Sequence, residues 1–179
     1  MSIFGDKPVY SEEEWALVAR GFNEMGRLAR EKDMIFTVHH HMGTGVQTEE
    51  EIDRLMELTD PNLVYLLYDT GHLAFSGEDA LRVLRKYAKR VKHVHLKSVR
   101  NDVVAKAKAG GYSFLDAVRA GAFTVPGDGD FDFQPVFDIL AENGYEGWVV
   151  VEAEQDPAKA NPFEYAVMAR EYIRRTEGL

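Results

Sequence analysis

The sequence predicts a single α/β domain built from parallel β/α units. Three observations predict it. Short continuous apolar runs alternate with stretches of helical period, four such runs are each followed by a helical pattern, and the ends of the runs carry histidines and carboxylates. Parallel strands need helical crossovers, and in such folds the chemistry gathers at the carboxyl ends of the strands.

The four apolar runs have the length and composition of short buried strands. They are residues 34–38, 63–68, 91–96 and 148–152. Capping boxes that begin at Ser11 and Thr48 start the first two helices, and residues 1–10 form a lead-in segment. Further helical patterns lie at residues 78–89, at 135–142 with a proline in the first turn, and from Asn161 onward. Residues 97–132 form a long excursion that could hold one short helix, at 112–120.

The composition of the chain argues against several classes of function. The chain has 179 residues, 45% of them hydrophobic, which is enough for one core, and its net charge of −9 disfavours binding to nucleic acid. No apolar run approaches the roughly 18 residues of a membrane span, and the N-terminus lacks the pattern of a signal peptide. Because cysteine is absent, a metal would bind through His, Asp, Glu and water. We therefore expect a soluble cytoplasmic protein with no nucleic-acid or membrane partner.

Histidines and carboxylates gather where the predicted strands end. All six histidines lie at or within a few residues of a strand end, whereas chance scatter would place several on helix surfaces. One side chain from each of the four strand ends can reach a common point, and together they predict a metal centre. The predicted ligands are His39, Asp69, His95 and Glu152.

Alternation of side chains along a strand leaves choices at two of these positions. His93 and His95 share a face, and we choose His95 because it lies nearer the rim, leaving His93 as a core histidine. His39 and His41 also share a face, and we choose His39. At a third position, Asp69 could instead cap the following loop.

Two carboxylates compete at the end of the last strand. Glu152 follows an apolar run, where a carboxylate is costly unless it is paired or bound to a metal, so it is the expected ligand. Glu154 shares its face and is either an acid–base group or a solvated loop carboxylate. Mixed imidazole and carboxylate ligands suit Mn²⁺ or Co²⁺, with Zn²⁺ or Fe²⁺ as alternatives, better than Ca²⁺ or Mg²⁺.

Five segments resemble the inosose dehydratases of the xylose-isomerase-like TIM barrel superfamily. They are His39–Gly45, Asp69–Leu73, His93–Lys97, Phe123–Gly129 and Val151–Ala160, and the resemblance runs from about Gly5 to the C-terminus. It implies that the four β/α units are the C-terminal half of an eight-stranded (β/α) barrel. A half-barrel exposes two sheet edges, so we expect the chain to form a homo-oligomer or to meet a separate N-terminal half.

The resemblance also implies a reaction, the metal-dependent removal of water from scyllo-inosose to give a trihydroxycyclohexane-dione. It makes Glu152 or Glu154 the base, and His72 or Lys97 the acid or the group that positions a hydroxyl. Substrate oxygens would be contacted by His41, His72 and Arg100.

Other functions fit the sequence less well. Superfamily members typically bind the metal through Glu, Asp, His and Glu, and His39 stands in the first position here. Losing that carboxylate argues against two-base chemistry, and therefore against a sugar isomerase or 3-epimerase. A phosphodiesterase or abasic-site endonuclease should show a basic face. A non-catalytic metal-binding half-barrel is the remaining alternative.

Overall fold

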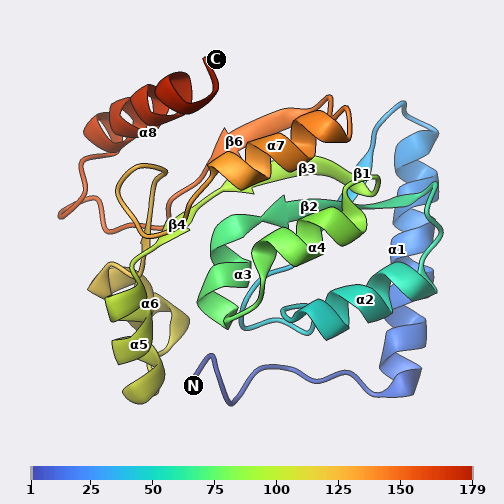
Figure 1. The fold of residues 1–179 in the computed structure, drawn as a ribbon. Coiled ribbons are helices and arrows are strands. Elements are labelled where there is room, and N and C mark those ends of the chain that lie inside the picture. Colours follow the sequence, from blue (N-terminus) through green and yellow to red (C-terminus); the bar gives the residue numbers. More distant parts are fainter. Residues whose placement is uncertain (1, 179) are drawn as a thin grey trace.

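The computed structural model describes residues 2–178, and Figure 1 shows how its elements are arranged. In chain order they are α1 (Glu12–Arg30), β1 (Phe36–His39), α2 (Glu49–Leu58), β2 (Val64–Asp69), α3 (Thr70–Ser76), α4 (Ala80–Tyr87), β3 (Val91–Leu96), β4 (Ser98–Val99), α5 (Asn101–Ala109), α6 (Phe114–Ala120), β5 (Phe123–Thr124), α7 (Gln134–Glu142), β6 (Trp148–Val151) and α8 (Pro162–Glu177).

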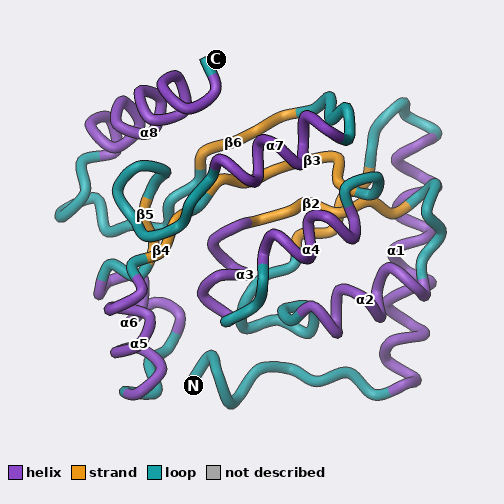
Figure 2. Tube along the Cα trace, in the orientation of Figure 1, coloured by secondary structure: helices purple, strands orange, loops and turns teal. Residues whose placement is uncertain are grey.

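The four longer strands form one parallel sheet, as the sequence predicts. Its order is β1-β2-β3-β6, and β4 and β5 form a separate antiparallel pair (Figure 2). In this register Asp69 lies opposite His95, and His95 lies opposite Val150. The carboxyl ends of the strands therefore meet at one edge of the sheet.

The main core lies between one face of the sheet and the helices α2, α4 and α7. Val38, Leu66 and Val94 are buried in this core, and by alternation His39, Asp69 and His95 take the opposite face. The capping boxes at Ser11 and Thr48 are both formed, so α1 and α2 begin where the sequence places them. Helix packing thus fixes one face and leaves the polar strand-end residues together on the other.

Three features differ from the sequence predictions. The last strand is predicted to be buried, but β6 lies at the edge of the sheet and Trp148 is 77% exposed. The first strand begins at Phe36, and Met34 and Ile35 before it are exposed. The reason is the same at both places, because within residues 2–178 each outer strand has a neighbour on one side only.

The third difference is additional structure around predicted elements. The excursion holds the expected short helix as α6, but also α5 and the β4–β5 pair. The helix predicted over 78–89 is shorter and is preceded by α3, which ends at Ser76 and is capped by Gly77 with a φ of 85°. Asp79 then caps α4 by accepting a hydrogen bond from the backbone N–H of Arg82.

Two glycines of α1 predict opposite effects of the same substitution. A Cβ on Gly26 would lie 2.8 Å from the carbonyl carbon of Leu63, whereas a Cβ on Gly21 would meet nothing within 4 Å. We expect Gly26→Ala to destabilise the fold by about 1–3 kcal/mol through steric overlap. Gly21→Ala should stabilise it by up to about 1 kcal/mol through helix propensity. Urea unfolding measures both, and equal effects of the two substitutions would contradict this packing.

Candidate metal centre

Asp69 stands at the middle of the strand-end cluster. Its side chain is fully buried, and one oxygen, Oδ1, accepts a hydrogen bond from the backbone N–H of His72 at 2.9 Å and so caps α3. The other oxygen, Oδ2, lies 3.3 Å from Nε2 of His39 and 3.4 Å from Nδ1 of His95. Capping and facing the cluster are therefore not alternatives for Asp69, because each role uses a different oxygen.

The structure brings the four predicted ligands together. Nδ1 of His95 lies 2.7 Å from Oε2 of Glu152, and one ligand atom from each of the four residues lies within 4.8 Å of the others. Each residue comes from the end of a different strand of the parallel sheet or directly follows it. His93 has no place in this group, although its ring packs 5.2 Å from that of His95.

Two buried atoms of this group indicate that it fits a cation. Within residues 2–178, Nδ1 of His95 and Oε2 of Glu152 face each other at 2.7 Å without the geometry of a hydrogen bond, and the charged Lys97 lies 3.1 Å from the same oxygen. Buried polar atoms are rarely left unpaired in native proteins. Two imidazoles and two carboxylates form a ligand set that suits a divalent transition metal.

Neighbouring opposite charges shift the pKa values of these ligand groups. Burial alone would lower the pKa of His95, but its contacts with Asp69 and Glu152 raise that pKa to about 9. Burial likewise opposes ionisation of Asp69, yet His39 and His95 hold its pKa well below the usual range. The pKa of Glu152 is also lowered, because His95 and Lys97 outweigh the effect of burial. Asp69 and Glu152 are thus held as carboxylates, the form that binds metals.

Lys97 places a positive charge beside the ligands. Its side chain is fully buried, and its ammonium lies 3.1 Å from Glu152, 3.5 Å from Asp69 and 2.7 Å from Glu154. The three carboxylates raise its pKa above the ordinary value despite the opposing effect of burial. Thr70 fixes the backbone of Lys97, because its hydroxyl accepts from the N–H of Lys97 and donates to the carbonyl.

A second cluster adjoins the first. Ligand atoms of His41, His72 and Glu154 also lie within 4.8 Å of one another, and the rings of His41 and His72 are 3.7 Å apart. Burial lowers the pKa of His72, whereas contacts with Glu154 and the Met42 carbonyl raise that of His41 against burial. The predicted catalytic residues Glu152, Glu154 and His72 therefore lie in two adjoining clusters, and the fourth, Lys97, contacts members of both.

His40 supports the centre from the other face of β1. It is fully buried, and its Nε2 accepts a hydrogen bond of 3.1 Å from the backbone N–H of Asp69. Burial lowers the pKa of His40 to about 3, so its ring is neutral. Alternation places His40 on the core side of the strand, but the sequence carries no signal of its hydrogen bond to Asp69.

Arg100, a predicted substrate contact, has its guanidinium bound to residues of a loop. Its guanidinium contacts Asp128, Thr124 and the carbonyl of Gly121. These contacts tie the start of α5 to the segment around β5. A role for Arg100 at the substrate therefore stays a prediction.

A pocket of about 430 Å³ opens beside the second cluster. His41 lines it together with Met42 and Phe114. The ring of Phe114 also packs 5.3 Å from that of His41, so α6 of the long excursion forms one wall of the space next to the cluster. Sequence reasoning misses Phe114, because a short helix within a long loop gives no signal of where it packs.

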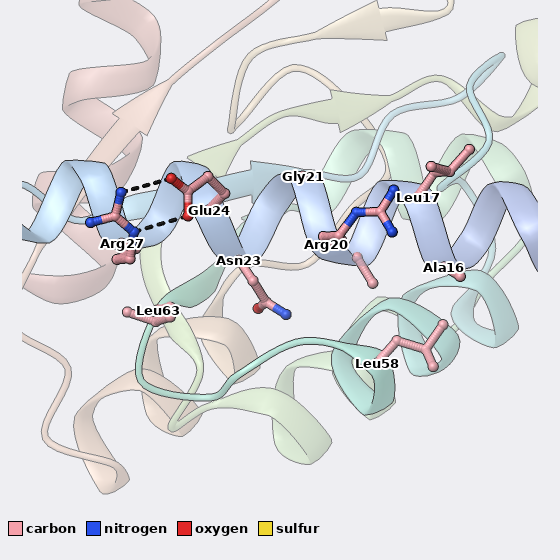
Figure 3. A pocket seen from close by; sticks show the side chains of 10 residues that line it. Ala16, Leu17, Arg20, Gly21, Asn23, Glu24, Arg27, Leu58 and Leu63 are labelled. Carbon is pink, nitrogen blue, oxygen red and sulfur yellow. Dashed lines mark hydrogen bonds and ion pairs between the residues drawn. The ribbon is translucent and has the colours of Figure 1, made fainter.

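Another pocket lies away from these clusters. It has a volume of about 970 Å³ and runs along α1 towards Leu58 and Leu63 (Figure 3). Its lining includes an ion pair between Glu24 and Arg27 but no histidine, so no residue in it indicates a metal site, despite the size of the pocket.

Within residues 2–178, none of the helices combines the length and apolar composition needed to cross a membrane. The cytoplasmic location stays a prediction.

Comparison with known sequences shows close relatives. The sequence model of the family described as "Xylose isomerase-like TIM barrel" matches residues 3–176. An inosose dehydratase of Clostridium tetani is 68% identical over 172 residues, which is 96% of this chain and 58% of that protein. An inosose dehydratase of Geobacillus thermodenitrificans is 64% identical over 99% of this chain and 59% of its own length. The chain thus spans less than two thirds of the curated relatives it matches.

Solved structures show the same fold at low sequence identity. A sugar phosphate isomerase/epimerase from Parabacteroides distasonis has a TM-score of 0.70 at 17% identity, covering 95% of this chain and 55% of that one. The IolI protein, in a structure with a bound zinc atom, has a TM-score of 0.63 at 18% identity, covering 97% of this chain and 57% of its own. Both matches support the fold prediction of a barrel of this type.

Proposed function

We propose that this chain, which belongs to the xylose isomerase-like TIM barrel family, carries the metal centre of an enzyme that dehydrates inosose. The observation that carries the proposal is the convergence of His39, Asp69, His95 and Glu152. The high identity to inosose dehydratases over nearly the whole chain points to this substrate. The reaction would be a hydro-lyase step that converts scyllo-inosose to a trihydroxycyclohexane-dione in inositol breakdown.

The four residues would hold one divalent ion, with Mn²⁺ and Co²⁺ favoured by the ligand set and Zn²⁺ and Fe²⁺ as alternatives. When bound, the ion supplies Lewis acidity, which draws charge from the substrate ketone and makes the adjacent C–H more acidic. Because His39 stands where a carboxylate is usual, the carboxylates that can act as bases are Glu152 and Glu154, both at the end of the same strand. That arrangement suits elimination better than epimerisation, which needs bases on opposite faces of the substrate.

The remaining steps are proton transfers by side chains of this chain. Glu152 or Glu154 takes the α-proton, and His72 or Lys97 delivers a proton to the departing β-hydroxyl. Support comes from Lys97, whose ammonium lies 2.7 Å from Glu154 and 2.9 Å from Nε2 of His72. The acid and base groups thus lie side by side, so they would act on one face of the substrate, as in a syn elimination.

Substrate hydroxyls would meet the second cluster and the pocket beside it. His41 and His72 offer ring nitrogens there, and we keep Arg100 as a further contact through its loop. The pocket volume of about 430 Å³ lies within the range of roughly 300–1,000 Å³ that is usual for small-molecule sites.

The proposal is tested by an assay of metal-loaded protein on scyllo-inosose, with loss of one water measured by mass spectrometry. The chain is assayed alone and mixed with the part of the Clostridium tetani relative that it does not match. We expect metal-dependent dehydration that a chelator abolishes in at least one of these samples. Bound metal with no turnover in either sample would instead support a non-catalytic metal-binding half-barrel.

We also propose that the open sheet edges are covered by a second copy or by a separate N-terminal half-barrel. Trp148 on β6 and Met34 and Ile35 before β1 are exposed apolar side chains at these edges. Light scattering coupled to gel filtration should give a mass above that of the monomer, or a complex with the unmatched part of the relative. A monomer at every concentration that ignores that part would contradict this assembly.

A further inference from the structure

The second cluster has the ligands of a metal site in its own right. The atoms of His41, His72 and Glu154 span no more than 4.8 Å, the same limit as in the first cluster. Two imidazoles and one carboxylate form a set found in catalytic zinc sites, where a fourth position stays open. This observation raises the question of how many ions the combined centre binds.

The ammonium of Lys97 contacts two of the three residues of this second cluster. Its Nζ lies 2.9 Å from Nε2 of His72 and 2.7 Å from Oε2 of Glu154. The side chain is fully buried, and a Cβ on Gly71 would lie 2.5 Å from its Cγ, so the stem is closely packed. A divalent ion could not share this space with the ammonium, because the two would overlap and repel each other.

Charge balance favours one ion while Lys97 is present. With His95 neutral, as a metal ligand must be, Asp69, Glu152 and Glu154 face only the ammonium of Lys97, and one divalent ion would neutralise their surplus of about two negative charges. Without the ammonium the surplus is larger, and buried charge of this kind needs compensation. Both the position and the charge of Lys97 therefore favour binding of one ion over two.

We propose that the Lys97 side chain takes the place of a second metal ion, which His41, His72 and Glu154 would otherwise bind. Lys97 thereby limits the centre to one ion. The inference rests on the proposed metal centre but not on the dehydration of inosose. Its consequence is that His72 and Glu154 remain available to substrate, because an N–H donor rather than a metal stands between them.

The test counts ions per chain after equilibration with Zn²⁺ and removal of excess. We expect one ion in the unaltered chain, two in Lys97→Met, and one again when His41→Ala is added to Lys97→Met. Lys92→Met is the matched control, because Lys92 lies on β3, the strand that Lys97 directly follows, and its side chain is exposed. It should leave the count at one.

A count of one in folded Lys97→Met, or of two in the unaltered chain, would overturn the inference. If Lys97→Met does not fold, anomalous diffraction from the unaltered chain at saturating Zn²⁺ decides. A single peak among His39, Asp69, His95 and Glu152 supports the inference, and a second peak between His41 and His72 refutes it. Failure of the function proposal looks different, since turnover would then be missing while these counts hold.

Discussion

Asp69→Asn is expected to lower the affinity of the centre for Zn²⁺ or Mn²⁺ by more than about 100-fold, since loss of an outer partner alone costs 10–100-fold. The amide would be neutral and would offer one oxygen in place of two. Asparagine caps a helix as well as aspartate does, so it can keep the hydrogen bond to the N–H of His72 and preserve α3. Isothermal titration calorimetry on metal-free protein measures the change.

The matched control for this substitution is Asp102→Asn. Asp102 also pairs with a lysine, Lys106, but both side chains are exposed on α5. Its loss should leave metal affinity unchanged. An affinity for Asp69→Asn within a few-fold of the unaltered chain would remove Asp69 from the ligand set.

Glu152→Gln is expected to abolish dehydration, with a loss of at least about 1,000-fold in kcat. The substitution removes a proposed metal ligand, and if Glu152 is the base it also removes general-base catalysis, which alone contributes roughly 100- to 10,000-fold. The side chain keeps its shape, and Lys97 keeps Asp69 and Glu154 as counter-charges at 3.5 and 2.7 Å. Initial rates on scyllo-inosose, with metal content measured in parallel, check the prediction.

Two further glutamine variants interpret that result. Glu146→Gln changes an exposed carboxylate shortly before β6 and should leave the rate unchanged. Glu154→Gln separates the two candidate bases, because Glu154 lies outside the four-residue ligand set. Near-normal turnover in Glu152→Gln would end its proposed role, whatever Glu154 does.

The parallel sheet and the four-residue cluster could be predicted because both depend on local patterns. In a strand of period two, the position of Asp69 or His95 at or next to the strand end fixes which face its side chain takes, and parallel strands bring such ends together. The exposure of Trp148 could not be predicted in this way. An apolar run specifies a strand, but its position at a sheet edge depends on what lies beyond it.

The second cluster depends on contacts between distant segments. His41 follows β1, His72 lies in α3 and Glu154 follows β6, so their convergence depends on how three loops fold. The position of the Lys97 ammonium likewise depends on the turn at Thr70, which bonds to its backbone. The sequence pattern marks these residues as polar groups near strand ends, but their partners are set by the loops that follow the strands.

The ligands of the first cluster come from four different strand ends, and this has a consequence for the lifetime of the protein. An ion held there would join all four strands of the sheet, including the exposed edge strand β6 that leads to Glu152. At a free concentration 100 times its dissociation constant, such an ion adds about 2.7 kcal/mol to the free energy of unfolding. Metal starvation would then shorten the lifetime of the protein, because chains without the ion would unfold more often and be cleaved by proteases sooner.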